Sequence, residues 1–202
     1  MQIYKAPFWL PWVYPSLTWH KDRSEKCLFL TFDDGPVPDV TEEIIFILKK
    51  YGIRATFFCV GENIQRHPQL FEELKVEGHR IGNHSYNHLN GWATSDEAYL
   101  QNVEKCEALT QTKLFRPPYS KIRRSQIRAL KYQYEIIMWD VVSRDYDPQV
   151  SPEQCLKNTL KHTGNGSIIV FHDHVKAWSN VRYALPRAVE QWLSEGYRFE
   201  VL

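Results

Sequence analysis

Short runs of apolar residues alternate with longer stretches in which apolar residues recur every three or four positions, from Lys26 to the C-terminus. The short runs are rich in β-branched and aromatic residues and predict strands, whereas the longer stretches predict amphipathic helices. Such an alternation is typical of βαβ units, and therefore of a parallel sheet. The predicted strands span residues 27–32, 55–60, 79–84, 113–117, 134–141, 167–173 and 197–202.

The ends of several predicted helices carry capping signals. Asp39 with Glu42 forms a capping-box-like start, and Gly52 can end the same helix in a left-handed conformation. Thr94 with Glu97 gives the same kind of start to the segment that follows it. Comparable signals predict a helix from Ser151 and Pro152 to near Gly164, one after His67 that ends at Gly78, and one around Tyr183 that ends at Gly196.

Seven strands joined by helices can form either an open doubly wound sheet or a barrel, and the pattern alone does not choose between them. No linker, repeat or low-complexity segment divides the chain, so we expect one α/β domain over residues 26–202. In both architectures the chemistry lies in loops after the C-terminal ends of strands. Those loops are therefore the place to look for a site.

The first twenty residues are apolar and aromatic, but they predict neither a membrane span nor a signal peptide. Pro7, Pro11 and Pro15 interrupt any helix, no cleavage site follows, and no apolar run approaches the roughly 20 residues of a transmembrane helix. We expect residues 1–25 to form an arm that packs on the domain. The missing signal favours the cytoplasm, with the cell envelope as the alternative that an envelope substrate requires.

The composition excludes several classes of protein. With 202 residues, of which 43% are hydrophobic and 14% aromatic, the chain can bury a core and is not disordered. A formal net charge of +1 gives no electrostatic footprint for nucleic acid or for an anionic membrane surface. The cysteines form no Cys-x-x-Cys pair and are expected to be packing thiols: Cys27, Cys59, Cys106 and Cys155.

Two adjacent carboxylates, Asp33 and Asp34, follow the first predicted strand of the domain within the segment Thr-Phe-Asp-Asp-Gly-Pro. Asp-Gly-Pro is a turn signal, so a turn with solvated carboxylates is the simpler interpretation. Because side chains alternate along a strand, however, the two carboxylates point in different directions. One can then bind a metal while the other faces a substrate.

Two histidines, His84 and His88, follow the third predicted strand. Spaced four apart, they would share one face of a helical turn, as in many zinc sites, although two surface histidines at this spacing are also common. Together with an aspartate from another strand end they form a set of two imidazoles and one carboxylate that leaves a position open for water. That set is typical of a catalytic metal site.

Further candidates follow other predicted strands. Arg116, held before two prolines, is either an exposed charge on a rigid loop or a guanidinium that orients a carboxylate, for which Asp33 is the candidate. His172 ends a strongly apolar strand and can act as a general acid if a carboxylate such as Asp145 raises its pKa. An ordinary strand end is the alternative for the two stretches that carry Asp145 and His172. His174 either shares the strand face of His172 or lies in the loop beyond it.

In this order, and each at a strand end, these stretches closely resemble the motifs of the polysaccharide deacetylase family, also called the NodB-homology domain or carbohydrate esterase family four. The resemblance runs from about Lys26 to Leu202, and its two most specific motifs, Thr-Phe-Asp-Asp-Gly-Pro and His-Ser-x-x-His, are intact. It implies that residues 26–202 are a catalytic domain with the fold of a distorted (β/α) barrel, here with about seven strands.

The resemblance also implies roles for individual residues. Asp33 is similar to the family's general base, and Arg116 is similar to the residue that orients this base. His172 is similar to the general acid, with Asp145 as its tuning partner. The backbone amide of Tyr119 is similar to the donor that stabilises the oxyanion. The implied metal ligands are Asp34, His84 and His88.

Three positions depart from the family pattern. In the fourth motif Val142 stands at the first Asp and Tyr146 at the Trp, and in the fifth motif Val170 stands where Leu is usual. We expect the aromatic and apolar changes to reshape a pocket without abolishing catalysis, and the lost Asp to affect substrate contacts. Among nearby aromatic residues, Tyr119 and Trp178 are expected to line a sugar-binding groove.

The implied activity is metal-dependent removal of N-acetyl groups from sugars such as N-acetylglucosamine in chitooligosaccharide, peptidoglycan or a related glycan. An acetylated glycan or oligosaccharide is the expected partner. The expected cofactor is a divalent metal, Zn²⁺ first, with Co²⁺, Ni²⁺ or Fe²⁺ as alternatives. O-acetyl ester hydrolysis on a polysaccharide such as xylan is a second interpretation. A non-catalytic glycan-binding protein is a third, against which the intact motifs count.

Overall fold

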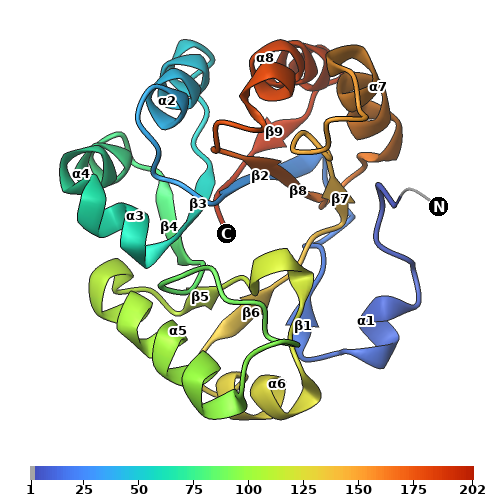
Figure 1. Ribbon diagram of the computed structural model, residues 1–202. Coiled ribbons are helices and arrows are strands. Elements are labelled where there is room, and N and C mark those ends of the chain that lie inside the picture. Colours follow the sequence, from blue (N-terminus) through green and yellow to red (C-terminus); the bar gives the residue numbers. More distant parts are fainter. Residues whose placement is uncertain (1–2) are drawn as a thin grey trace.

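One sheet curls into a half-barrel in the computed structural model, which describes residues 3–202 (Figure 1). Eight strands follow the order β1-β6-β5-β4-β3-β2-β8-β7, β9 pairs with the start of β2, and these pairs are parallel. The strands are β1 (Leu17–Thr18), β2 (Cys27–Asp33), β3 (Thr56–Cys59), β4 (Arg80–Asn83), β5 (Leu114–Phe115), β6 (Glu135–Ile137), β7 (Val141–Val142), β8 (Ile168–His172) and β9 (Arg198–Phe199).

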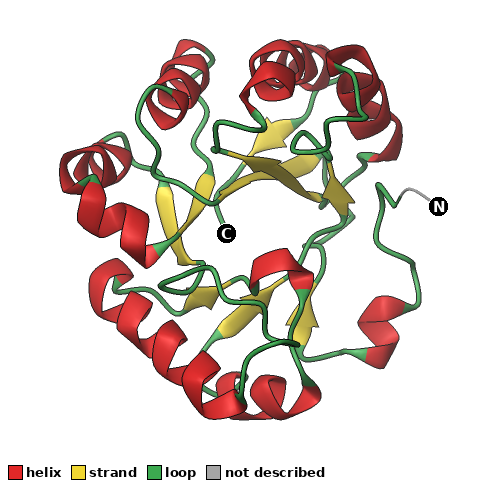
Figure 2. Ribbon diagram, viewed as in Figure 1, coloured by secondary structure: helices red, strands yellow, loops and turns green. Residues whose placement is uncertain are grey.

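Helices surround the sheet on its outer side, and the strands line the inside (Figure 2). The parallel order and this single outer layer of helices make the fold a distorted (β/α) barrel, as the resemblance implies, and not an open doubly wound sheet. The helices are α1 (Leu10–Val13), α2 (Val40–Lys50), α3 (Gly61–Arg66), α4 (Pro68–Val76), α5 (Asp96–Thr110), the 3-10 turn η1 (Pro118–Ser120), α6 (Arg124–Leu130), α7 (Pro152–His162) and α8 (Trp178–Ser194).

Alternation along β2 explains how the barrel presents polar groups at one end. Leu28, Leu30 and Phe32 point outward into the core beneath the helices. Cys27 and Phe29 point inward, where they belong to a small apolar cluster that closes the bottom of the barrel. Because side chains on one face of a strand recur every second residue, Thr31 and Asp33 follow on the inward face toward the top.

The sequence predicts each strand of four or more residues, but it does not predict β1 or separate β6 from β7. β1 and β7 have two residues each, too few to show an alternation of apolar and polar positions. β5 and β9 are equally short, but they lie within the predicted strands 113–117 and 197–202. The start of α5 is also misplaced by one residue. Its N-cap is Ser95, whose side chain accepts a hydrogen bond from the Ala98 amide, whereas the Thr94 hydroxyl donates to the Asn90 carbonyl.

The described part of the N-terminal arm covers the gap between the two ends of the sheet (Figure 1). Lys5 forms an antiparallel bridge with Val141, and His20 forms one with Ser167. Further along the arm Trp19 is buried. Among residues 3–202 no helix combines the length and apolarity needed to cross a bilayer. All the cysteines are free and buried, as the sequence predicts.

Candidate active site

Arg116 lies at the centre of the polar end of the barrel and fixes Asp33. Its Nη1 donates to Asp33 Oδ1 at 2.6 Å and to Thr31 Oγ1 at 2.7 Å, two acceptors on the same face of β2. Its Nη2 donates to the Met138 carbonyl at 3.0 Å, and the guanidinium lies 4.1 Å from the Phe58 ring centre. The arginine side chain is only 1% exposed, so it is a buried orienting group and not the loop charge that the sequence left open.

Asp34 leaves the strand with a φ of 90°, which turns its side chain away from that of Asp33. The Asn63 side chain donates to the Asp34 carbonyl at 2.7 Å and holds this turn. Asp34 Oδ1 lies 3.1 Å from His88 Nε2 and 3.6 Å from His84 Nε2. The ligand atoms of these three residues all lie within 4.8 Å of one another, close enough to surround one ion.

The two histidines converge because of an irregular loop, not because of a helical turn as the sequence predicts. Residues 84–88 form no helix, and Ser85 and His88 have positive φ angles of 61° and 55°. The Asn102 side chain accepts from the backbone amides of Tyr86 and Asn87 at 2.8 and 3.0 Å and so holds the loop. His84 and His88 thus approach each other as the spacing predicts, but through an irregular loop instead of a helical turn.

Hydrogen bonding and burial make Asp34, His84 and His88 suitable ligands for a cation. His84 Nδ1 donates to the Arg116 carbonyl at 2.8 Å, which leaves the Nε2 lone pair facing Asp34. Burial lowers the pKa of His84 to about 4, although Asp33 opposes this shift, so the imidazole is neutral at pH 7. Burial raises the pKa of Asp34, but the His88 hydrogen bond and the His172 charge outweigh it and keep the carboxylate ionised. Two imidazoles and one carboxylate fit a divalent cation.

His172 and Asp145 form a second ion pair beside Asp33. His172 Nδ1 donates to Asp145 Oδ1 at 2.7 Å, and the His172 backbone amide donates to Asp145 Oδ2 at 2.7 Å. Burial opposes the charge on His172, but the buried Asp145 outweighs it and raises the pKa of His172 to about 10. The imidazole is therefore protonated at neutral pH, with its Nε2 proton free to be donated.

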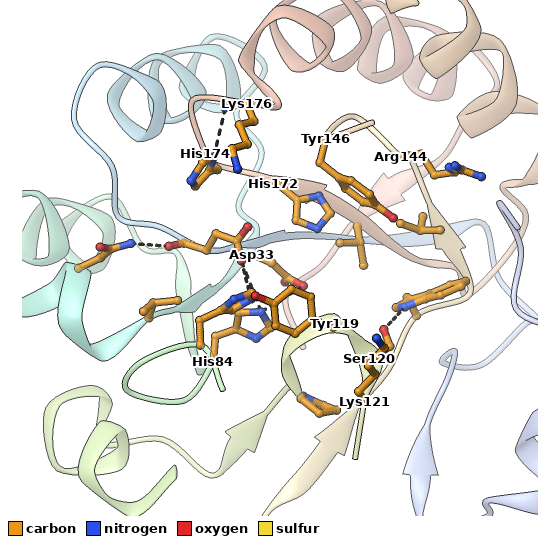
Figure 3. Close-up of a pocket in the computed structure, with 18 of the residues that line it drawn as sticks. Asp33, His84, Tyr119, Ser120, Lys121, Arg144, Tyr146, His172, His174 and Lys176 are labelled. Atoms are coloured by element: carbon orange, nitrogen blue, oxygen red, sulfur yellow. Dashed lines mark hydrogen bonds and ion pairs between the residues drawn. The ribbon is translucent and has the colours of Figure 1, made fainter. Parts of the chain in front are cut away.

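One cavity of about 900 Å³ is lined by five of these residues (Figure 3): Asp33, Asp34, His84, His88 and His172. Tyr119 and Tyr146 line it, the former 4.4 Å from the His88 ring centre and the latter edge-on to His172 at 4.9 Å. Val142 also lines it, so the departures from the family pattern change the wall of this cavity. Trp178 does not: it packs against the core under the helices, which corrects its expected place in a groove.

The structure resolves the position of His174, which the sequence left open, and adds cavity residues that the sequence did not select. His174 lies in the loop beyond β8 and lines the cavity together with Lys121, Arg144 and Lys176. Asp173 is fully buried and binds the turn that carries Asp34, through a pairing between positions 138 apart in the chain. No local pattern in a sequence reveals a contact of that kind.

Residues 20–135 match the polysaccharide deacetylase family model. The chain belongs to the polysaccharide deacetylase family. It is 34% identical over 194 residues to a peptidoglycan-N-acetylglucosamine deacetylase of Bacillus cereus, and the match covers 91% of this chain and 89% of that one.

Solved structures of the family have the same fold. A crystal structure of the Bc1960 peptidoglycan N-acetylglucosamine deacetylase, in complex with an N-hydroxybenzamide derivative, superposes with a TM-score of 0.90 at 30% identity and covers 98% of this chain and 95% of that one. A mutant of BA3943, a family pseudoenzyme with restored enzymatic activity, superposes with a TM-score of 0.77 at 26% identity and covers 90% of this chain and 67% of that one. The fold alone thus does not establish catalysis, and the site residues must carry that argument.

Proposed function

We propose that this chain is a metal-dependent hydrolase that removes N-acetyl groups from N-acetylated sugars. The observation that carries the proposal is the arrangement of three sets of groups around one cavity: Asp33 held by Arg116, the Asp34–His84–His88 cluster, and the His172–Asp145 pair. Hydrolysis of an amide needs an activated water, a stabilised oxyanion and a proton for the leaving nitrogen. Each set supplies one part of this requirement.

Asp34, His84 and His88 would hold the cation. When bound, a divalent cation supplies Lewis-acid chemistry, lowering the pKa of a water to about 7 and polarising the acetyl oxygen. Zn²⁺ is the first choice for this ligand set, and Co²⁺, Ni²⁺ and Fe²⁺ are alternatives.

Asp33 is the proposed general base. Arg116 occupies its Oδ1, while Oδ2 lies 3.9 Å from His84 Nε2 and so faces the three-ligand cluster. This oxygen takes the proton from the attacking water as the water oxygen bonds to the acetyl carbon. Arg116 fixes the direction of the carboxylate through this hydrogen bond, and the Tyr119 backbone amide is the proposed donor to the oxyanion.

His172 is the proposed general acid. Its Nδ1 proton is bound to Asp145, so the Nε2 proton is the one delivered to the sugar nitrogen as the carbon–nitrogen bond breaks. The products are acetate and a free amine. Delivery to nitrogen matters because an amine anion is a poor leaving group, whereas the alkoxide released from an ester leaves more readily. Dependence of turnover on His172 therefore separates N-deacetylation from O-acetyl ester hydrolysis.

N-acetylglucosamine in peptidoglycan or chitooligosaccharide is the proposed substrate. The name of the Bacillus cereus relative supports the peptidoglycan sugar among these. The cavity of about 900 Å³ is large enough for more than one sugar ring, and its aromatic wall includes Tyr119, Trp139 and Tyr146.

The experiment is acetate release from N-acetylglucosamine oligomers and from peptidoglycan, after the metal is removed with a chelator and Zn²⁺ or Co²⁺ is restored. Activity should return with the metal, and Asp33→Asn and His172→Ala should each lower turnover by at least about a hundredfold. Asp22→Asn, an exposed carboxylate far from the cavity, is the matched control and should keep full turnover.

Other outcomes assign the alternatives. Faster release from O-acetylated xylan, with turnover that survives His172→Ala, indicates an esterase. Stoichiometric metal, measurable affinity for the glycan and no release from any substrate indicate a binding protein. Full activity in Asp33→Asn removes that residue from the mechanism.

A further inference from the structure

The outer face of the arm carries apolar side chains that the fold leaves uncovered. Phe8 and Trp12 are 78% and 79% exposed, and their rings meet edge to face at 6.0 Å. Trp9 and Val13 are also exposed, and no residue of α1 is buried. We call these four residues the arm patch. A cluster of exposed aromatic rings is typical of a surface that contacts another protein or a membrane.

Beside this patch, the outer face of α6 carries unpaired positive charge. Arg124, Arg128 and Lys131 are exposed and lie on one face of the helix because they are spaced four and three residues apart. Among the ion pairs of residues 3–202, none involves these three α6 cations. The chain has no acidic residue between Glu107 and Glu135, nor between residues 3 and 21.

The patch and the α6 cations form one surface. Leu10 and Tyr14 from the arm pack against the same core cluster as Ile127 and Leu130 from α6, so the inner sides of the two segments meet. On the outer side the Arg124 guanidinium lies 5.8 Å from the Tyr14 ring centre. Figure 1 shows α1 and α6 on the same side of the barrel. A net charge of +1 for the whole chain conceals this local concentration of cations.

We propose that this surface docks the protein onto a phospholipid bilayer with anionic headgroups. Tryptophan and phenylalanine settle at the boundary between headgroups and acyl chains, and neighbouring Arg and Lys side chains attract anionic lipids. The four patch residues do not line the 900 Å³ cavity. Their exposed side chains therefore suit contact with a flat bilayer better than binding of a small ligand.

The docked orientation bears on the site. Ile3, at the start of the described arm, lines the cavity, and the Tyr4 carbonyl accepts from the Val142 amide at 3.0 Å. The arm therefore runs from the cavity wall to the patch. Docking through the patch holds the cavity beside the bilayer, where membrane-proximal glycan is within reach.

The test is co-sedimentation of the whole chain with vesicles, which needs no enzymatic activity. Binding is expected to equimolar phosphatidylglycerol and phosphatidylcholine, to be weak on phosphatidylcholine alone, and to fall when salt is raised to about 0.5 M. Phe8→Ser with Trp12→Ser should weaken binding by at least about tenfold. Neutralising all three α6 cations to Gln should weaken it by about a hundredfold, since each contributes a factor of about five.

Matched controls lie on other faces of the barrel. Phe46→Ser with Val76→Ser removes equally exposed apolar side chains from α2 and α4. The triple variant that replaces exposed cations of α7 and α8 by Gln matches the loss of charge, at positions Lys157, Lys161 and Arg182. Both controls should bind vesicles as the parent chain does, and thermal unfolding should show that every variant is folded.

Three results overturn the proposal. The first is no binding to phosphatidylglycerol vesicles, or the same loss in the controls as in the test variants. The second is a dimer seen by light scattering that Phe8→Ser with Trp12→Ser dissociates, which assigns the surface to a second copy. The third is lipid-free binding to insoluble cell-wall glycan that the same double variant abolishes.

Discussion

Arg116 and Asp33 form an ion pair in which both side chains are buried, with 1% and 8% of their surface exposed. Removing one partner of such a pair leaves a buried charge without compensation, whereas changing both does not. Thr31 and the Met138 carbonyl satisfy further donors of Arg116, so the pair is part of a small network. The stability of this network can be tested independently of any activity.

We predict that Arg116→Met lowers the free energy of unfolding by about 3–5 kcal/mol. Adding Asp33→Asn to this variant removes the carboxylate that has lost its partner. The free energy of unfolding of the double variant should therefore fall by about 2 kcal/mol less than the sum of the losses in the two single variants. Urea denaturation of the four chains of this cycle measures the coupling. Strictly additive losses would contradict a direct interaction.

His79 predicts a dependence of stability on pH. Its Nδ1 accepts a hydrogen bond from the Ala55 amide at 3.2 Å, which requires the neutral ring, and burial lowers its pKa from 6.5 to about 4. Between pH 6.5 and 4, His79 is protonated in the unfolded chain and neutral in the folded chain. Stability therefore falls as pH drops through this window, by up to about 3 kcal/mol.

His79→Gln supplies a non-titrating acceptor at the same place. Urea denaturation at a series of pH values should show a shallower fall in stability for this variant between pH 6.5 and 4. His67→Ala, which removes a less buried histidine, is the control and should keep the slope of the parent chain. Equal slopes in all three chains would remove His79 as the cause.

At the scale of elements, Asp173 joins the end of β8 to the loop after β2. Its Oδ1 accepts from the Gly35 amide at 2.9 Å and its Oδ2 from the Thr41 hydroxyl at 2.8 Å. A Cβ added to Gly35 would lie 1.8 Å from Asp173 Oδ2, so only glycine allows this close approach. The turn that carries Asp34 is thus fixed from the neighbouring strand.

Asp173→Ala should lower the free energy of unfolding by about 2–4 kcal/mol, because it leaves a buried amide and a buried hydroxyl without an acceptor. It should also weaken Zn²⁺ binding, measured by isothermal titration calorimetry, because Asp34 loses its fixed position. Asp22→Ala removes an exposed carboxylate that accepts one backbone hydrogen bond, from Ser24, and should cost less than about 1 kcal/mol. Unchanged zinc affinity in Asp173→Ala would show that Asp34 does not depend on this contact.

Long elements were the most predictable from the sequence, and the short strands β5 and β9 were found only within longer apolar segments. Strands such as β2 and β8 and the long helices have enough residues to show a period, and capping residues such as Ser151 mark their ends. Short elements such as α3, of six residues, carry too little pattern. The strand order was likewise undetermined by local pattern, because pairing depends on contacts between distant segments.

At the scale of the whole molecule, the metal-binding set draws on two strand ends. Asp34 follows β2, whereas His84 and His88 follow β4, so a bound cation would tie two segments together. Zn²⁺ at about 100 times its Kd should stabilise the chain by about 3 kcal/mol and raise Tm by about 5–10 °C. His88→Ala should lose this shift, and His67→Ala should keep it. A shift that survives His88→Ala places the ion elsewhere.

The sequence selected several of the side chains that line the cavity, but not how they are held there. Residue types and strand ends selected Asp33, His84 and His172 because catalytic chemistry favours few residue types. Positive φ angles at Asp34 and His88, and the Arg116 carbonyl that orients His84, are backbone features without a sequence signal. Distant pairs such as Asp173 with Gly35 arise only once the barrel has formed.

Asp33 and His172 lie on the paired strands β2 and β8, whereas most of the residues that line the cavity lie outside the strands. Asp33 and His172 are direct partners across these neighbouring parallel strands, so their spacing comes from the sheet itself. Most of the cavity wall, including Tyr119, Tyr146 and Lys176, comes instead from connecting segments. Segments can therefore be lengthened, exchanged or grafted to admit a different ligand while the proposed proton donor and acceptor keep their separation. In this barrel, diversification of substrate range need not disturb the reaction that serves it.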